Sequence, residues 1–358
     1  MLRVEGLSIS FRTDEGPVTP VQGVSFGVAK GKTLGLVGES GSGKSISTKA
    51  LMGLLPATAT LGAETQIHYT AKDGRTVAIE SLKPSGAAIR RLRGGEIGMI
   101  FQEPMASFSP VYTIGNQMVE AIQLHRALGR RAARAFAVEM LDKVGIANPR
   151  ARIDQYVHEM SGGMRQRAMI ALTLAAGPQL LIADEPTTAL DVTIQAQVLE
   201  LMAGLQGELG MGMIFISHDL GVIAQIAHEV AVMYLGTIVE RGPTREVIRN
   251  PRHPYTMGLL QAIPSLDRLT ARLSPVPGDI PSPHARPAGC AFHPRCPRAI
   301  PGLCDTRDPF EQAEAGCAVR CWLYHDAGRR SSTCSRTSRG PWGFPFCSSP
   351  TTCRWWPR

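Results

Sequence analysis

The order of apolar and polar residues predicts strands at the start of the chain, followed by a strand, a loop and a helix. Apolar residues alternate with polar ones at Leu2, Val4, Leu7, Ile9 and Phe11. This alternation predicts an antiparallel region over about residues 1–30. Thr33–Val37 is a short apolar run that predicts a strand, and Ser45–Met52 has helical spacing. The glycine-rich residues between them therefore form a loop between a strand and a helix.

The middle of the chain changes from a helical pattern to alternating helices and strands. Helical periodicity dominates over Glu103–Met160, with helices expected at Ile114–Leu128 and Ala132–Val144. Alternation of helices and strands returns over Ala168–Gly236. From Gly242 onward proline and glycine become more frequent, which indicates a change of module.

The loop after Val37 has the spacing of a phosphate-binding loop. Glycines let consecutive backbone N–H groups turn inward around an anion, and the following helix directs the positive end of its dipole at the phosphates. Lys44 is then expected to reach the β- and γ-phosphates, and the Ser45 hydroxyl to bind Mg²⁺. The alternative, a glycine-rich turn without a ligand, is disfavoured by the full spacing and both flanking elements. The residues assigned to nucleotide binding are Gly38, Ser40, Gly41, Ser42, Gly43, Lys44 and Ser45.

Two further apolar runs end in residues that can act on a phosphate. Asp184 follows Leu180–Ala183, where a carboxylate can hold Mg²⁺, and Glu185 points to the other side as a candidate general base. A solvated strand end before a turn is the alternative, and it is weak beside a phosphate loop. Met213–Ser217 ends at His218, a candidate γ-phosphate contact because the carboxyl ends of parallel strands meet at the nucleotide crevice. A lone histidine is otherwise more often an ordinary surface or core residue.

Together these motifs resemble those of the ATPase subunits of ABC transporters, from the N-terminus to about Tyr324. Gly38–Ser45 matches the Walker A motif of that family, Leu180–Glu185 its Walker B motif, Ser161–Gln166 its signature, Asp191 its D-loop aspartate, Gln102 its Q-loop glutamine, His218 its switch histidine and Phe11 the aromatic residue that stacks on adenine. Met160 stands where the family usually has leucine, a substitution of similar volume.

The resemblance implies how the motifs work together. Ser161, Gly162 and Gly163 would contact ATP on the phosphate loop of a second ATPase subunit, so that two head-to-tail subunits enclose two nucleotides. Asp191, the D-loop aspartate, is assigned with them to nucleotide binding. The resemblance also implies Mg²⁺ ligands and catalytic residues. The Mg²⁺ ligands would be Ser45, Gln102 and Asp184, and the catalytic residues would be Glu185, His218, Gln102 and Lys44.

Two longer segments, Gln102–Gly115 and Asn250–Leu260, resemble the ATPases of oligopeptide, dipeptide and nickel importers. Each is a proline-bounded turn that leads into a helix, and a turn is all that the residues alone establish. The resemblance implies import of peptides or related solutes, with Gln102 linking the γ-phosphate to the surface that receives the permease. The implied partners are a second ATPase subunit, identical or paralogous, two membrane permease subunits and an extracytoplasmic solute-binding protein. We therefore expect a peripheral protein on the cytoplasmic face of the cell membrane.

Composition narrows the classes of function. The net charge is +8, but residues 327–358 hold six arginines and no acidic residue, which leaves +2 for the rest of the chain. That balance removes the main argument for a nucleic-acid partner. No stretch reaches the roughly 20 uninterrupted apolar residues of a membrane-spanning helix. Arg3 and Glu5 interrupt the N-terminus, so no signal peptide is expected.

The cysteines form a separate group. All eight lie at or after Cys290, which is typical of a reducing compartment with one specialised cysteine site. In the resembling importers a carboxy-terminal cysteine motif of this kind accompanies an iron–sulfur cluster. The matching residues here are Cys290, Cys296, Cys304 and Cys321, with Cys317 an extra. Four thiolates suit a [4Fe–4S] cluster or tetrahedral zinc, and unligated cysteines are the third alternative.

We therefore predict an α/β fold of the P-loop NTPase type, with an antiparallel β subdomain, a helical subdomain and a small carboxy-terminal accessory segment. The expected divisions are an ATPase domain over residues 1–240, its helical subdomain at about 103–165, a transporter-like segment at 241–326 and a disordered basic tail at 327–358. The main rival is a soluble ABC-type ATPase that acts on nucleic acid or ribosomes. An exporter subunit is a third alternative, disfavoured because no membrane helices are fused to the chain.

Overall fold

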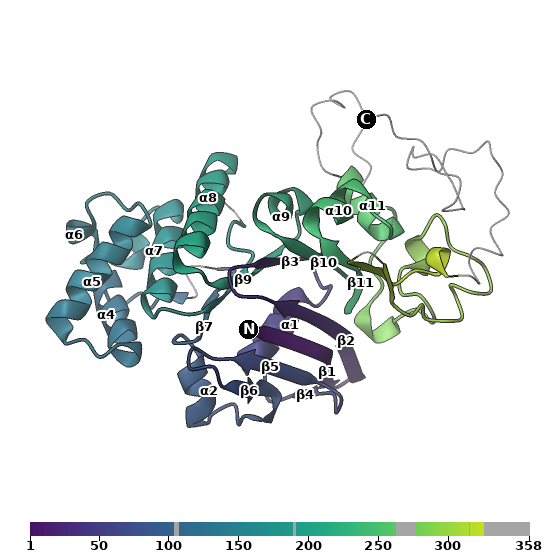
Figure 1. Ribbon diagram of the computed structural model, residues 1–358, viewed down its shortest axis with the longest axis horizontal. Helices are drawn as coiled ribbons and strands as arrows, with labels where there is room; N and C mark the ends of the chain where they lie inside the picture. The colour runs from purple at the N-terminus through teal and green to yellow at the C-terminus, as the bar shows by residue number, and fades with distance from the viewer. Residues whose placement is uncertain (104–106, 189–190, 263–275, 315, 326–358) are drawn as a thin grey trace.

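The computed structural model describes residues 1–103, 107–188, 191–262, 276–314 and 316–325. These residues form an antiparallel sheet, a larger mixed sheet, and helices that cover the mixed sheet or extend beyond its β7 edge (Figure 1). An α/β fold of this kind is what the sequence predicts. No helix of the described residues has the length and apolar character needed to cross a membrane.

The antiparallel sheet holds the start of the chain. Its strand order is β2-β1-β5-β6, and β4 pairs with β1. The bounds are β1 Leu2–Thr13, β2 Gly16–Val28, β4 Ala59–Leu61, β5 Gln66–Thr70 and β6 Thr76–Ala78. The apolar residues of β1 alternate as the sequence indicates, and Leu7 and Ile9 are fully buried. The predicted antiparallel region over residues 1–30 is confirmed.

The mixed sheet carries the residues expected to act on phosphate. Its order is β12-β13-β11-β10-β3-β9-β8-β7, with parallel pairing from β10 to β7 and antiparallel pairing from β10 to β12. The bounds are β3 Thr33–Val37, β7 Ile97–Ile100, β8 Leu180–Asp184, β9 Gly212–Ser217, β10 Glu229–Tyr234, β11 Thr237–Pro243, β12 Gln312–Glu314 and β13 Cys317–Val319. Every residue of β3, β8 and β9 is buried, as expected of parallel strands covered on both faces.

Two apolar cores lie on the two faces of this sheet. Ile182 and Ile214 face the core that also contains residues of β1, β2 and α1. Leu181 and Phe215 face the other core, which includes the helices α4, α5, α7, α8 and α9. Because neighbouring residues of a strand point to opposite faces, each central strand holds both layers together.

The helices begin and end close to the expected positions. Their bounds are α1 Lys44–Leu51, α2 Ala87–Leu92, α4 Ile114–His125, α5 Arg130–Lys143, α6 Pro149–Arg152, α7 Gly162–Ala175, α8 Val192–Leu209, α9 Leu220–Ile226, α10 Thr244–Arg249 and α11 Pro254–Gln261. Single 3₁₀ turns occupy Ile79–Ser81, Val157–Glu159, Pro283–Ala285, His293–Arg295 and Trp322–Tyr324. α4 ends before the predicted Leu128 because Arg126 is extended and its Nε donates to the Ala175 carbonyl at 2.9 Å.

The segment after β11 folds back onto the mixed sheet. β11 continues past residue 240, where the sequence predicts a division between domains. Its residues Glu240 and Arg241 pair with Val319 and Ala318 of β13. In Figure 1 this yellow-green segment lies beside β11, at the end of the molecule opposite α4 and α5. The predicted divisions at residues 103, 165 and 240 stay predictions, and the predicted tail at 327–358 lies outside the described residues.

Candidate nucleotide site

The phosphate loop connects β3 to α1, as the sequence predicts. A Cβ on Gly38 would lie 2.2 Å from the Met233 carbonyl oxygen, so the loop packs directly on the end of β10. Gly43 has φ +97 and precedes α1 without a side-chain cap, which leaves the first N–H groups of the helix open to a ligand. The loop is therefore built by backbone contacts that a larger residue at Gly38 would block.

Lys44 and Ser45 lie at the start of α1. Lys44 contacts the phosphate loop, and Ser45 contacts the end of β8. The Lys44 ammonium donates to the carbonyl oxygens of Gly38 at 2.7 Å and Glu39 at 3.0 Å. The Ser45 hydroxyl donates to Oδ1 of Asp184 at 2.8 Å, which joins α1 to the end of β8. Burial lowers the pKa of Lys44, and the carboxylates of Glu185, Asp184 and Glu39 oppose that shift. Burial also raises the pKa of Asp184, while its bond from Ser45 acts in the opposite direction.

A second group of side chains meets at one oxygen of Glu185. Oε2 of Glu185 accepts hydrogen bonds from Nε2 of Gln102 at 3.1 Å and from Oγ1 of Thr188 at 3.0 Å. Nδ1 of His218 lies 3.6 Å from the same oxygen. The residues come from three segments, after β7, β8 and β9, so the order of the parallel strands brings them together. Three of the four were predicted as site residues.

The backbone at Glu185 is strained. Its φ is +47, a left-handed conformation that a glutamate rarely adopts. The Glu185 N–H donates to the Ile216 carbonyl at 3.1 Å and its own carbonyl accepts from the Thr188 N–H at 3.2 Å, which hold the turn in place. In this backbone conformation the Glu185 carboxylate reaches Gln102 and His218.

The signature residues lie elsewhere in the chain. Ser161 caps α7, and its Oγ accepts from the Met164 N–H at 3.4 Å. A Cβ at Gly162 would have open space, while one at Gly163 would approach Ile194 at 3.3 Å. In Figure 1, α7 lies with α4, α5 and α6, well to the left of α1. The fold therefore does not gather the signature with the phosphate loop of the same chain.

Asp191 and Phe11, two other predicted site residues, contact their own helix and the core. Asp191 caps α8, and its Oδ1 accepts from the Ile194 N–H at 2.9 Å. Phe11 lies on β1 and packs, half-buried, against the core of the antiparallel sheet. Adenine stacking by Phe11 and nucleotide binding by Asp191 stay predictions. Ala189 and Leu190, the rest of the expected D-loop, lie outside the described residues.

The cysteines of the accessory segment are free thiols. Cys290 and Cys296 are half-buried, and Cys304, Cys317 and Cys321 are buried. Burial raises the pKa of Cys290 to about 11 and that of Cys296 to about 12, and the neighbouring thiol of Cys304 acts in the same direction on both. Within the described ranges, no group of three or more His, Cys, Asp or Glu side chains is arranged to hold a metal ion. The predicted iron–sulfur cluster, like the zinc alternative, therefore gains no support from the structure.

Thr188 and Arg295 are the residues that the sequence analysis missed. Thr188 lies in the turn two residues after Pro186, where a threonine carries no signal of its own. Arg295 reaches the loop residue Glu39, which lies 256 positions away in the sequence. Only the tertiary structure shows such a contact.

Comparison with known proteins agrees with this geometry. The family described as ABC transporter matches residues 21–188, and the family described as oligopeptide/dipeptide transporter, C-terminal region, matches residues 239–304. The fold and the phosphate loop thus define an ATPase of the ABC class, as the motifs predict.

Curated relatives place the chain within that class. A protein of Brucella abortus (strain 2308) named as a peptide import ATP-binding protein is 49% identical over 327 residues, covering 90% of this chain and 96% of the relative. A protein of Brucella suis biovar 1 (strain 1330) with the same kind of name is 48% identical over 322 residues, covering 90% and 94%. The chain therefore belongs to the ATP-binding subunits of the oligopeptide/dipeptide ABC transporter family.

Solved structures share the fold. The dimeric structure of MJ0796, a bacterial ABC transporter cassette, has a TM-score of 0.59 and 22% identity, and covers 68% of this chain and 99% of that one. The structure of cbiO1 from Clostridium perfringens, part of the cbiONQ transporter complex, has a TM-score of 0.56 and 25% identity, and covers 70% and 90%. The predicted P-loop NTPase fold is confirmed.

Proposed function

We propose that this chain hydrolyses ATP to power the import of peptides or related solutes across the cytoplasmic membrane. It would act as a peripheral subunit on the cytoplasmic face, together with a second ATPase subunit, two permeases and an extracytoplasmic solute-binding protein. The observation that carries the proposal is the convergence of Gln102, Thr188 and His218 on Glu185, next to a complete phosphate loop. The names of the relatives support peptides as the solute class.

The residues at the phosphate loop fit ATP with Mg²⁺. The Ser45 hydroxyl and the Asp184 carboxylate, 2.8 Å apart, form a pair of oxygen ligands of the kind that Mg²⁺ prefers, and Gln102 would be the third side chain. Bound Mg²⁺ would neutralise charge on the β- and γ-phosphates. The Lys44 ammonium, which satisfies loop carbonyls in the structure, would turn to the phosphate oxygens.

Glu185 would be the general base. Its Oε2 is held by Gln102 and Thr188, so the carboxylate is fixed while its other oxygen can accept a proton from the attacking water. His218, whose imidazole is 61% exposed, would contact the γ-phosphate from the same side. Catalysis would then consist of placing water in line with the γ-phosphate and holding its developing charge.

The signature would act on a second subunit. Ser161, Gly162 and Gly163 lie at the N-terminus of α7, away from the phosphate loop of their own chain. A helix N-terminus with small residues is suited to approach an anion. Two head-to-tail chains would therefore complete each other's sites, with Asp191 at the contact.

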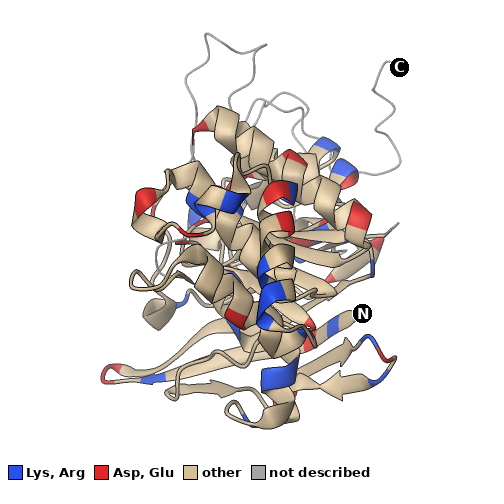
Figure 2. Ribbon diagram, turned by 90° about the vertical axis from the view of Figure 1, so that its left-hand side faces the viewer, with Lys and Arg blue, Asp and Glu red and all other residues tan. Residues whose placement is uncertain are grey.

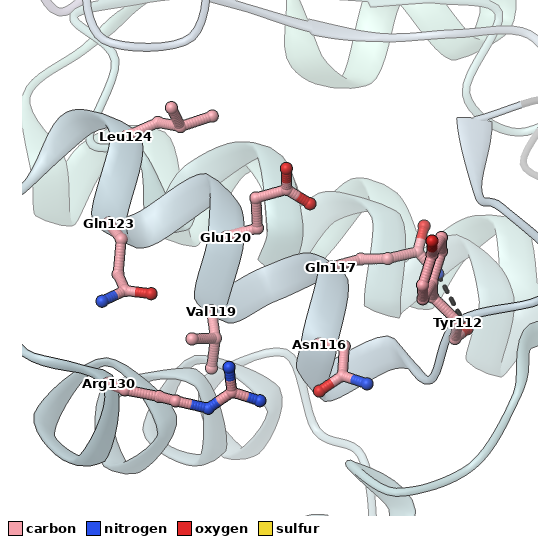
Figure 3. Close-up of a pocket in the computed structure, with 8 residues that line it drawn as sticks. All are labelled: Tyr112, Asn116, Gln117, Val119, Glu120, Gln123, Leu124 and Arg130. Atoms are coloured by element: carbon pink, nitrogen blue, oxygen red, sulfur yellow. Dashed lines mark hydrogen bonds between the residues drawn. The ribbon is translucent and has the colours of Figure 1, made fainter.

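A pocket on α4 would receive the permease. It has a volume of about 560 Å³, and its lining comes from Tyr112, from α4 and from Arg130 at the start of α5 (Figure 3). Its lining residues are Tyr112, Asn116, Gln117, Val119, Glu120, Gln123, Leu124 and Arg130. Val111, Tyr112 and Leu124 are 70%, 57% and 73% exposed, so apolar side chains are available for contact at and beside this pocket. Pro104, Met105 and Ala106 of the importer-like segment Gln102–Gly115 lie outside the described residues.

A role on nucleic acid finds less support. The helices on the face shown in Figure 2 carry acidic residues among the basic ones, whereas a surface that binds nucleic acid is dominated by Lys and Arg. The match to the transporter C-terminal region also favours import over the soluble rival.

Phosphate release by the purified full-length chain tests the hydrolysis. Glu185→Gln keeps the shape of the side chain and removes the base, so ATP binding should persist while turnover falls by at least about a hundredfold. Glu200→Gln, at an exposed position of α8, is the matched control and should hydrolyse ATP like the unaltered chain. Normal turnover in Glu185→Gln would refute the assignment of the base.

Uptake of labelled peptides tests the transport. Cells that lack the gene should lose uptake, the unaltered gene should restore it, and Glu185→Gln should not. Normal peptide uptake in cells without the gene would refute the proposed solute class.

A further inference from the structure

A buried ion pair joins the accessory segment to the phosphate loop. Nη1 of Arg295 donates to Oε2 of Glu39 at 2.8 Å, and Nη2 donates to Oε1 at 3.1 Å. The Arg295 side chain is only 4% exposed and that of Glu39 27%. Two parallel bonds from one guanidinium to one carboxylate fix both the position and the orientation of Glu39. Nothing in the proposed catalytic cycle uses this pair.

Glu39 is the second residue of the phosphate loop, between Gly38 and Ser40. Its carbonyl oxygen accepts from the Lys44 ammonium at 3.0 Å, and its N–H donates to the Tyr255 hydroxyl at 2.9 Å. Tyr255 belongs to α11, which like Arg295 follows the mixed sheet's β11 in the chain. Two residues that follow β11 therefore hold Glu39: Tyr255 contacts its backbone and Arg295 its side chain.

Arg295 is itself fixed on all sides. Its Nε donates to the Pro277 carbonyl at 2.9 Å and its Nη2 to the Val276 carbonyl at 3.2 Å. The guanidinium carbon also lies 5.7 Å from the centre of the Tyr234 ring and 6.0 Å from that of Phe292. A guanidinium with this many partners has little freedom to leave Glu39.

Arg286, which also follows β11 in the chain, supports the phosphate loop through the turn at Leu235 and Gly236. Nη1 of Arg286 donates to the Leu235 carbonyl at 2.6 Å. The next residue, Gly236, donates its N–H to the Ser42 carbonyl at 3.0 Å, inside the phosphate loop. Leu235 has φ +42, so the turn that supports the loop is strained and depends on such contacts.

A carboxylate inside a phosphate loop works against the binding of a triphosphate. Without a cation beside it, Glu39 would repel the phosphates and compete with them for Lys44. We propose that Arg295 is a positioning residue for ATP: it neutralises Glu39 and fixes the loop, so that the accessory segment sets the affinity of the phosphate loop for nucleotide. This inference rests on the proposed ATP-binding function, and it assigns to the accessory segment a role in the nucleotide site.

The test compares the full-length chain with Arg295→Met and with the double variant Glu39→Gln/Arg295→Met, by titration with MgATP. Arg295→Met should weaken ATP binding about tenfold, because it leaves a half-buried carboxylate unpaired beside the phosphates. The double variant, which has neither charge, should bind within about threefold of the unaltered chain. A merely structural role for Arg295 would not be rescued by removing the charge of Glu39.

Arg241→Met is the matched control. Arg241 also joins the mixed sheet to the accessory segment, through Glu311 at 2.7 Å, but this pair is exposed and involves no loop residue. Its loss should leave ATP affinity unchanged. Circular dichroism checks the folding of each variant. If Arg295→Met alone does not fold, the double variant decides, and a tenfold loss of affinity in it overturns the proposal.

Two other results would also overturn the proposal: normal ATP affinity in Arg295→Met, or equal weakness in the single and double variants. Failure of the proposed function has a different signature, since the unaltered chain would then bind no ATP at all.

Discussion

At the scale of single residues, the site depends on how one carboxylate is held. Glu185 has a strained backbone, and its Oε2 receives hydrogen bonds from Gln102 and Thr188. Strain of this kind persists only where surrounding contacts over-determine the conformation. Thr188 contributes to both, because its hydroxyl donates to the Glu185 carboxylate and its N–H donates to the Glu185 carbonyl.

Removing the Thr188 hydroxyl should slow hydrolysis without weakening ATP binding. In Thr188→Val the methyl groups keep the volume of the side chain, but Glu185 loses one of its donors, worth about 1 kcal/mol or roughly a fivefold loss of rate. Thr188→Ser retains the hydroxyl and should keep most of the activity. Steady-state phosphate release measures both variants, and an unchanged kcat in Thr188→Val would mean that Gln102 alone suffices.

At the scale of elements, α11 begins at an unusually buried histidine. His253 is 1% exposed, and its Nδ1 accepts from the Tyr255 N–H at 3.1 Å, which caps the helix that reaches Glu39. Its own N–H donates to Glu240 of β11 at 2.9 Å. Burial lowers the pKa of His253 from 6.5 to about 3, so the imidazole stays neutral in the folded chain.

This histidine should make the fold sensitive to acid. Below pH 6.5 the unfolded chain binds a proton at His253 that the folded chain does not bind until about pH 3. The contribution to stability is thus complete above pH 6.5 and falls by roughly 1.4 kcal/mol per pH unit as the pH decreases. His253→Asn keeps a capping oxygen and cannot titrate, so urea unfolding at pH 7, 6 and 5 should show a shallower decline.

His158→Asn is the control for that measurement, because His158 is exposed at the end of the helical part. It should leave the pH dependence as it is. Identical slopes for the unaltered chain and for His253→Asn would show that other groups dominate the acid response.

The pocket on α4 gives a second prediction at this scale. Tyr112→Ala and Leu124→Ala each remove an exposed apolar side chain that supports no core. Purified protein should therefore hydrolyse ATP at its normal rate, while peptide uptake in cells falls several-fold because the permease contact is lost. Leu209→Ala, on the similarly exposed end of α8, should affect neither measurement. Equal loss of hydrolysis and uptake would make the pocket residues merely structural.

At the scale of the whole molecule, the separation of α7 from α1 supports the proposal that two chains make one complete site. The phosphate loop and Glu185 lie on the mixed sheet, whereas Ser161 lies in the helical part (Figure 1). A head-to-tail pair with two-fold symmetry would bring each signature to the partner's loop.

Mixing two inactive variants should restore activity. Ser161→Arg keeps its phosphate loop, and Lys44→Ala keeps its signature, so a mixed pair contains one intact composite site and one doubly damaged site. With random pairing, half of the dimers carry one such site, and activity should reach roughly a quarter of normal. Each variant alone should stay inactive, and a mixture as inactive as its parents would remove support for sites shared between chains.

The sequence by itself determined the local parts of this protein. The spacing of Gly38–Ser45 between an apolar run and a helical run is a local property, because a phosphate loop is built from consecutive backbone N–H groups. Asp184, Glu185 and His218 could be found in the same way, since strand ends are visible as the ends of apolar runs. Periodicity also located α4 and α5, to within three residues at the least accurate end.

Only the tertiary structure decided which of these parts meet. Strand order brings Gln102, Thr188 and His218 to one oxygen of Glu185, and no local pattern encodes strand order. The same reason explains Arg295, whose partner Glu39 lies 256 residues earlier and is reached only because the chain folds back along β11. Cysteine spacing, in contrast, indicated a metal centre or unligated thiols, and within the described residues no group of side chains is arranged to hold a metal ion. The spacing of residues along the chain therefore predicts a site where consecutive residues build it, as in the phosphate loop. Contacts between distant segments, such as Arg295 with Glu39, depend on how the chain packs.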